Sequence, residues 1–108
     1  MVYKQGDVGD RSKENRKKFG KLIKECRIAA DLTQKDIADA IGLPYYTMIS
    51  QFENGYSRIP PDLFKKYAKA LKVDEFLFVK ENLRYNDPHT FSSLFGREKA
   101  LKAADLVV

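Results

Sequence analysis

The sequence lacks several of the residue types on which chemistry depends: it has no tryptophan, one cysteine and one histidine in 108 residues. Cys26 cannot form an intramolecular disulfide, and because it falls on an apolar helical stripe we expect a small buried residue rather than a reactive thiol. His89 has no second histidine and no cysteine near it, so no metal site is predicted. Because neither a nucleophile with its base nor a glycine-rich phosphate loop is present, we expect no enzyme activity and no cofactor.

Long apolar runs are also missing. No segment approaches the roughly 18 residues that a membrane span needs, and the N-terminal stretch lacks the apolar core of a signal peptide. The length suits one domain with one modest core. We therefore expect a cytoplasmic protein that does not enter a membrane.

Apolar residues recur with the period of a helix, and no segment alternates with period 2, which predicts an all-α fold. Phe19, Leu22, Ile23 and Cys26 define an amphipathic helix of about four turns. A second, short helix follows Thr33, whose spacing to Asp36 is that of an N-terminal cap, and it stops at Gly42. Two further helices are expected over Pro61–Leu71, burying Leu63, Phe64, Tyr67, Ala68 and Leu71, and over Asp74–Leu83, burying Phe76, Leu77 and Leu83.

Between these pairs lies GLPYYTMISQFENG, residues 42–55, which contains no lysine or arginine. Pro44 suits the first position of a helix because its missing N–H would be unpaired there, and Gly55 suits the left-handed residue at the end. The helical spacing directs Tyr45, Met48, Ile49 and Phe52 inward. By elimination, the outward side chains are Tyr46, Thr47, Ser50, Gln51 and Asn54.

Charge is unevenly distributed along the chain. Residues 1–27 carry nine basic and four acidic side chains, residues 28–57 one and four, and residues 58–85 seven and four. Two basic regions thus flank an acidic middle, which favours a polyanionic partner, although a lysine-rich face is often simply solvated. The stretch Arg11–Lys21 has two interpretations, an arm that reaches into a groove or the frayed start of a helix.

The C-terminal part predicts further helix. Asp87 and Pro88 have the order of a cap and a first helical residue, and Gly96 a stop, so one or two turns should present Phe91, Leu94 and Phe95. The tail from Arg97 has helix-forming residues and an apolar line of Leu101, Ala104 and Val108.

The motifs LTQKDIADAIGL and MISQFENG together resemble the Cro-like phage-repressor family, also called the XRE family of helix-turn-helix regulators. The resemblance covers about residues 19–83, with Leu32-Thr33-Gln34 opening the second helix, Ala38 packing against the third, and Gly42 in the turn. It implies a five-helix phage-repressor-like domain, here with a short C-terminal helical extension. The expected layout is a flexible basic arm at 1–13, the DNA-binding domain at 14–84 and a dimerisation element at 85–108.

The resemblance implies a sequence-specific DNA-binding regulator whose third helix enters the major groove. Gln51 has the donor and acceptor pair that matches adenine, and Thr47 can bond a base or touch a thymine methyl. The expected base-reading residues are Tyr46, Thr47, Ser50 and Gln51, with Tyr45 as a further contact. The family's phosphate contacts carry over to Gln34 and Asn54, Arg58 is added by position and charge, and Arg27 and Glu53 are implied as a structural ion pair.

One residue more than the family pattern stands between Gly42 and Ile49. It either lengthens the turn or adds a residue to the start of the third helix, so Tyr45 and Tyr46 could exchange their inward and outward roles. Either tyrosine could instead be a half-buried packing residue.

The expected function is a repressor that binds a palindromic operator in double-stranded DNA as a homodimer. The C-terminal apolar residues would extend the core and form the two-fold interface. Two alternatives remain. The chain could be an antitoxin whose C-terminal segment covers a toxin, or a protein-binding module that kept the fold without DNA function, which the acidic middle favours.

Overall fold

A computed structural model describes the backbone of residues 5–108 and the side chains of residues 11–108. Over this range the chain forms α-helices and no β-strand, so the all-α prediction is confirmed. The elements are α1 (Gln5–Ala29), α2 (Gln34–Ile41), α3 (Thr47–Glu53), the 3₁₀ turn η1 (Pro61–Leu63), α4 (Phe64–Leu71), α5 (Glu75–Asn86), α6 (Pro88–Phe95) and α7 (Ala103–Leu106).

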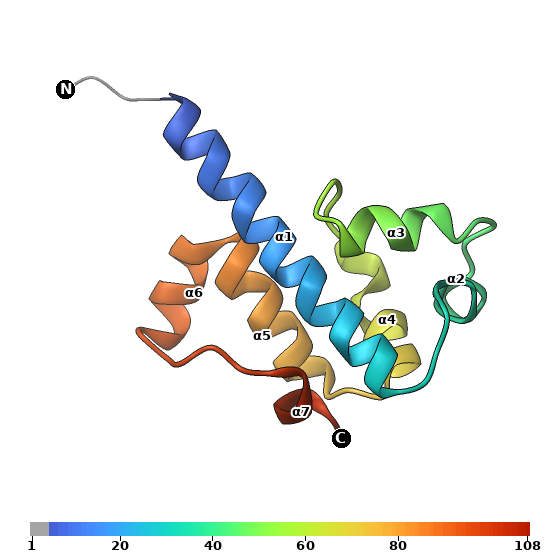
Figure 1. Cartoon of the computed structure of the whole chain (residues 1–108). Coiled ribbons are helices and arrows are strands. Elements are labelled where there is room, and N and C mark those ends of the chain that lie inside the picture. The colour runs from blue at the N-terminus through green and yellow to red at the C-terminus, as the bar shows by residue number, and fades with distance from the viewer. Residues whose placement is uncertain (1–4) are drawn as a thin grey trace.

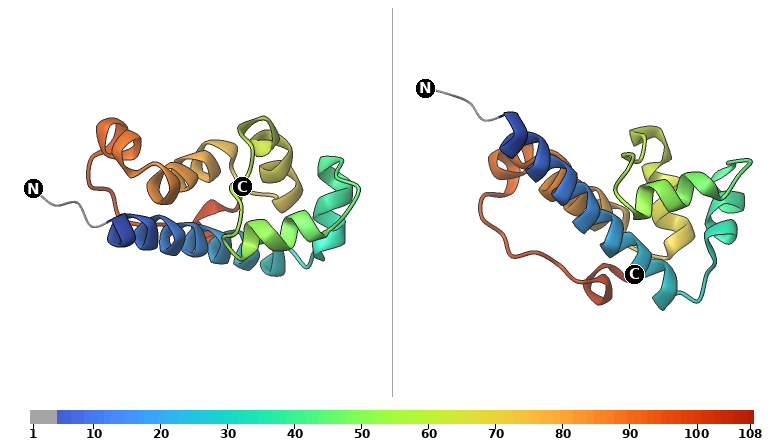
Figure 2. Two further views of the ribbon diagram at one scale, coloured as in Figure 1. Left: turned by 90° about the horizontal axis from the view of Figure 1, so that it is seen from above. Right: turned by 45° about the horizontal axis from the view of Figure 1, so that its top comes forward.

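The long helix α1 is the axis of the fold (Figure 1). α5 packs alongside α1, and α3 and α7 contact α1 at different points along its length. Figure 2 shows α2, α3 and α4 gathered at one end of the molecule and α6 at the other. The helix-turn-helix pair therefore lies at one end, away from α6.

The core is built on the apolar stripe of α1. Phe19, Ile23 and Cys26 are all buried, as their spacing predicts. Across from them the Phe78 ring lies 5.8 Å from the Phe19 ring and 5.7 Å from the Tyr67 ring, measured between centroids. These aromatic contacts join α1, α4 and α5 into one core, to which α2 adds Ile37, Ala38 and Ile41.

Four of the predicted helix boundaries are present in detail. Thr33 caps α2 and forms a capping box with Asp36, and Gly42 ends the helix at φ +80°. Asp87 caps α6, Pro88 is its first residue and Gly96 follows its last. Local chemistry determined these boundaries, because a cap needs only a side chain within three residues of the free N–H groups.

The structure corrects the predicted N-terminal arm. α1 begins at Gln5, so it covers most of residues 1–13, whereas residues 1–4 lie outside the described residues. Arg11–Lys21 had two interpretations, and the structure shows this stretch as part of the helix α1. The apolar stripe begins only at Phe19, so the hydrophobic pattern could not locate this earlier start.

The predicted inward face of α5 is wrong. Phe76 is 63% exposed, and the buried residues are Phe78, Glu81 and Asn82. Glu81 is fully buried and accepts hydrogen bonds from Arg84 Nε at 3.0 Å and from the Leu101 amide at 3.1 Å. Two of the buried positions of α5 carry polar side chains. A count of apolar residues alone therefore places the inward face about half a turn around the helix axis from where it lies.

The C-terminal tail is also different from the predicted apolar helix. Residues 96–102, here called the strap, run along α5 to the single turn α7, where Leu106 is completely buried. The Asp74 amide donates to the Leu106 carbonyl at 2.8 Å, and Val73 and Val107 form an isolated antiparallel bridge. Ala104 and Val108, predicted to line the tail's apolar face, are exposed.

Two cations of α5 hold the strap and α6 together. Arg84 donates to the carbonyls of Glu98 and Lys99, and its guanidinium lies 4.3 Å from the centre of the Phe91 ring. Lys80 pairs with Glu98 and stands 4.8 Å from the centre of the Phe95 ring. The strap is therefore tied to α5 by hydrogen bonds and an ion pair, and α6 is tied to α5 by the two cation–π contacts.

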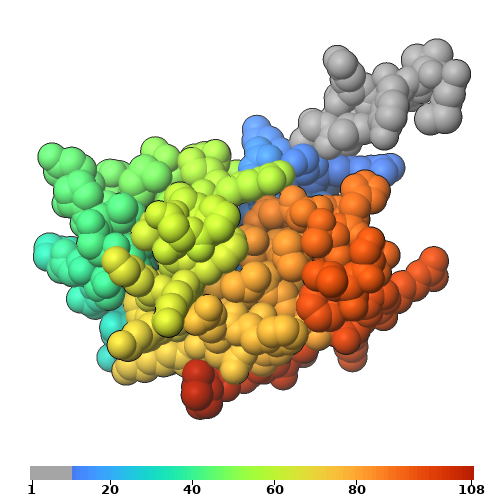
Figure 3. All heavy atoms as spheres, turned by 180° about the vertical axis from the view of Figure 1, so that it is seen from behind, coloured from blue at the N-terminus to red at the C-terminus, as the bar shows by residue number. Residues whose placement is uncertain are grey.

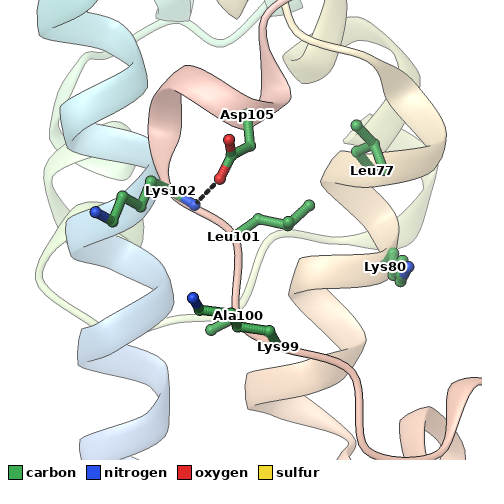
Figure 4. A pocket seen from close by; sticks show the side chains of 7 residues that line it. All are labelled: Leu77, Lys80, Lys99, Ala100, Leu101, Lys102 and Asp105. Atoms are coloured by element: carbon green, nitrogen blue, oxygen red, sulfur yellow. Dashed lines mark hydrogen bonds between the residues drawn. The ribbon is translucent and has the colours of Figure 1, made fainter.

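A hollow of about 550 Å³ separates the strap from α5. In Figure 4 the Leu101 side chain points from the strap toward α5, and Asp105 accepts a hydrogen bond from the Lys102 amide at 2.8 Å. Three lysines line this hollow, Lys80 from α5 and Lys99 and Lys102 from the strap.

Candidate nucleic-acid interface

The link between α2 and α3 settles how the additional residue is accommodated. α2 ends at Ile41 and α3 begins at Thr47, so residues 42–46 form a five-residue turn. Pro44 and Tyr45 lie in this turn and not in the helix, which corrects the predicted start at Pro44. The added residue therefore lengthens the turn.

Both tyrosines of the turn are exposed to solvent. Tyr45 is 71% exposed and Tyr46 54% exposed, so the prediction that Tyr45 points inward is wrong, as is a packing role for either. Met48, also predicted inward, is 36% exposed. A residue placed before the helix no longer follows the helical period, and this is why spacing assigned Tyr45 to the wrong side.

The inward face of α3 carries Ile49, Phe52 and Glu53, all buried. The outward side chains are those of Thr47, Gln51 and Asn54, with Ser50 half-buried between them. The Ser57 hydroxyl donates to the Gln51 side-chain oxygen at 3.3 Å, and the Asn54 amide donates to the Ser50 hydroxyl at 3.2 Å. α3 thus presents a polar surface without net charge, framed by the two tyrosines.

Glu53 is the centre of a network that fixes α3 to its neighbours. Arg27 of α1 donates from Nε to Oε2 at 2.7 Å and from Nη2 to Oε1 at 3.1 Å. The Gln34 amide of α2 donates to the same Oε1 at 3.1 Å, and Arg27 Nη1 donates to the Leu32 carbonyl at 2.9 Å. The bond to Glu53 raises the pKa of Arg27. The implied ion pair is present, and it links α1, α2 and α3.

The predicted phosphate-binding residues differ in their surroundings, and Gln34 has a hydrogen-bond partner inside the protein. Gln34 is half-buried and holds Glu53 with its side chain. Arg58 is exposed in the loop after α3. Hydrogen bonds from Thr90 lower the pKa of Asp87 at the start of α6, and the charge of Arg58 adds a smaller lowering. Asn54 is exposed at the end of α3.

Two glycines allow α3 to lie directly on α1. A Cβ atom on Gly20 would stand 2.3 Å from the Glu53 carbonyl oxygen, and one on Gly55 would stand 2.6 Å from the Lys17 amide nitrogen. Arg16 Nε also donates to the Gly55 carbonyl at 3.1 Å. Gly20 lies within an amphipathic helical pattern, where an isolated glycine can mark a close backbone approach.

Beside this contact, α1 and the end of α3 enclose a hollow of about 360 Å³. Its lining residues are Lys17, Lys21, Lys24, Glu53, Asn54 and Tyr56. The lysines recur at i, i+4 and i+7, the spacing of one helix face. Of these lining residues Asn54 was a predicted phosphate contact, and Lys17 and Lys21 fall in the stretch for which a groove-reaching arm was one interpretation. The sequence does not show that the end of α3 lies against this part of α1.

The described residues hold no group of three or more His, Cys, Asp or Glu side chains that could bind a metal ion. From residue 5 onward, no helix is both long and apolar enough to cross a membrane.

Comparison with known proteins agrees with the geometry. A family model described as helix-turn-helix matches residues 23–78, slightly more than half of the chain. This range starts within α1 and ends within α5, so it includes α2, the turn and α3. A search of curated protein sequences gives no significant match.

Proposed function

The chain belongs to the helix-turn-helix family of the Cro/C1 or XRE type, a family of DNA-binding regulator domains, and we propose that it is a repressor that binds a palindromic operator as a homodimer. The observation that carries the proposal is the surface of α3. Its buried side holds the helix rigidly, while its outward side offers hydrogen-bonding groups without charge. Such groups distinguish base edges, because the pattern of donors and acceptors in the major groove differs for each base pair.

Individual roles follow from side-chain chemistry and position. Gln51 is proposed to read adenine with its amide, Thr47 to contact a base or a thymine methyl, and Ser50 to let the helix approach closely. Tyr46 and Tyr45, at the start of α3, can place their rings against a thymine methyl or a sugar. The contacts with base edges and thymine methyls specify sequence, whereas a contact with a sugar does not.

Phosphate contacts position the domain without reading sequence. Asn54 is proposed for this role from its exposed place at the end of α3. Arg58 is proposed from the loop after it. Gln34 is the first residue of α2, where the family's contact is expected, and it would bind phosphate while Glu53 holds its side chain in one orientation.

The proposed dimer interface uses the apolar residues that the fold leaves uncovered. Phe91 and Leu106 were expected there, but they are buried within the protomer. Phe76 and Leu94 are each 63% exposed, and the Phe76 and Phe95 rings pack edge to face with centroids 6.0 Å apart. The proposed interface is therefore this patch on α5 and α6, whose helices are seen from behind in orange in Figure 3.

Selection of bound sites from random double-stranded DNA tests the proposal most directly. A two-fold symmetric motif with half-sites about one helical turn apart is the expected result, since the recognition helices of a symmetric dimer enter successive major grooves. Failure to enrich any sequence would contradict a DNA-reading role. An enriched motif without symmetry would contradict the dimer and leave base reading intact.

Sedimentation equilibrium tests the dimer separately. Replacing Leu94 with serine should shift the mass from dimer toward monomer, because the variant places a polar group in an apolar interface. Val108→Ser is the matched control, being an equally apolar residue that is 88% exposed but lies outside the patch. An unchanged mass for Leu94→Ser would exclude this interface.

A further inference from the structure

The charge that would attract DNA lies mostly outside the helix-turn-helix match. Residues 23–78 contain eight Lys or Arg and eight Asp or Glu, a net charge of zero. Residues 1–22 contain seven and three, a net charge of +4. Because neutralisation of phosphates supplies much of the affinity of DNA-binding proteins, a neutral reading unit needs a basic surface nearby.

The middle of α1 is fixed beside α3. Gly20 and Gly55 bring the two backbones into contact, and Arg16 donates to the Gly55 carbonyl at 3.1 Å. The ion pair between Arg27 and Glu53 adds a second link between the same helices one turn beyond Ile23. The side chains on this part of α1 therefore have a defined place relative to the end of α3.

Lys17, Lys21 and Lys24 form what we call the lysine ridge. All three are exposed and line the hollow of about 360 Å³ together with Asn54 and Tyr56. The Asn54 amide and the Tyr56 hydroxyl are further hydrogen-bond donors at this surface.

Acidic groups do little to offset the ridge. Glu53 is the acid in the lining, and Arg27 balances its charge. The nearest acid along the helix, Glu25, lines a second hollow that shares Lys21 with the first and also has Lys18 and Lys102 in its lining, so cations outnumber the acid there. The surface beside α3 is therefore cationic and carries hydrogen-bond donors, a combination that suits phosphodiester oxygens.

We propose that the lysine ridge binds backbone phosphates of the DNA next to the bases that α3 reads. The inference rests on the proposed function and extends it, because Lys17 and Lys21 precede the matched range. The ridge supplies affinity without sequence preference, and α3 supplies preference with little charge. The contact between α1 and α3 keeps the two surfaces in register on one duplex.

The test compares two triple variants of the full chain by titration with fluorescent duplexes at several salt concentrations. The first is Lys17→Gln, Lys21→Gln and Lys24→Gln. The control is Lys69→Gln, Lys72→Gln and Lys99→Gln, which removes the same charge from exposed lysines of α4, the residue that follows it and the strap. The duplexes are the selected operator and an unrelated sequence of equal length.

If each ridge lysine neutralises one phosphate, the ridge variant should flatten the slope of log K against log salt by about 3 per bound protomer. Its affinity should fall by the same factor for both duplexes, and the control should change the slope much less. A ridge variant with the wild-type slope, or a control that falls equally, would overturn the inference. The wild-type titration tests the proposed function separately. If the wild type shows no preference for the operator over the unrelated duplex, the proposed base reading by α3 is wrong. The salt slopes still show whether the ridge binds phosphates.

Discussion

Arg27 and Glu53 are joined by two hydrogen bonds, 2.7 and 3.1 Å long, across 26 residues of sequence. The Glu53 side chain is almost completely buried, while that of Arg27 is 12% exposed. The same carboxylate holds Gln34, so one charge orients three helices around the proposed reading surface.

Removing one partner of this pair should be costly. Arg27→Met leaves a buried carboxylate without its counter-charge, and breaking such a pair lowers the free energy of unfolding by about 3–5 kcal/mol. The double variant Arg27→Met with Glu53→Leu should recover much of that loss. Urea denaturation measures both, and Lys35→Met, which breaks an exposed pair with Asp39, should leave the midpoint almost unchanged. If Arg27→Met and Lys35→Met have the same urea midpoint, the buried pair of Arg27 and Glu53 does not stabilise the fold in this way.

The close approach of α1 and α3 predicts a large effect at Gly20. Alanine there would force the helices apart, and overpacking of this kind costs about 1–3 kcal/mol or more. Gly42→Ala is a useful comparison, because a Cβ at Gly42 meets no atom within 4 Å and only its φ of +80° opposes it. Strain of that kind costs about 1–2 kcal/mol. Thermal unfolding should rank Gly20→Ala as the less stable variant and, if the ridge must stay aligned with α3, operator affinity should fall with it.

The tail should behave as part of the core. Leu106→Ala removes a completely buried side chain, for which about 2–5 kcal/mol is expected. Val108→Ala changes an exposed position and should stay within about 0.5 kcal/mol of the wild type. Urea denaturation that gave equal stabilities would show that α7 does not close the core in solution.

Reading and positioning residues should respond differently to DNA sequence. Gln51→Ala should relax preference at one base pair in each half-site, at a cost of about 1–3 kcal/mol. Arg58→Ala should weaken operator and unrelated DNA by the same factor. Repeating the site selection with each variant measures both effects. If Gln51→Ala kept the wild-type motif and affinity, the assigned register of α3 would be wrong.

Cys26 should be protected in the folded protein. Burial raises the pKa of its thiol from 9.0 to about 11, which lowers the thiolate fraction at pH 8 by about 100-fold. Because the pKa is higher in the folded state, the thiol contributes stability below pH 9 and loses it as the pH rises toward 11. Iodoacetamide should therefore react far more slowly with the native protein than with the protein in urea. Comparable rates would mean that the α1 stripe opens readily.

Much of the fold can be predicted from short-range sequence patterns. The stripe of α1, the capping box of Thr33 and Asp36, and the cap and stop of α6 each depend on residues within about one or two helical turns. The resemblance to the family added the pair of Arg27 and Glu53, which no local pattern contains.

The errors come from two assumptions. The inward face of α5 and the position of Tyr45 were predicted as if only apolar groups were buried and every residue after a proline were helical. Glu81 contradicts the first assumption, because it is buried with Arg84 and the Leu101 amide both bound to its Oε1, while its Oε2 has no hydrogen-bond partner among the described residues. The five-residue turn contradicts the second.

The sequence by itself determined that this protein is all-α, where its second helix begins and ends, and which family it resembles, because caps and helical periods act between neighbouring residues. Only the tertiary structure decided which surface stands beside α3. The contact of the ridge with the end of α3, the path of the strap along α5 and the burial of Leu106 each join residues far apart in the chain, and such contacts depend on how backbones pack.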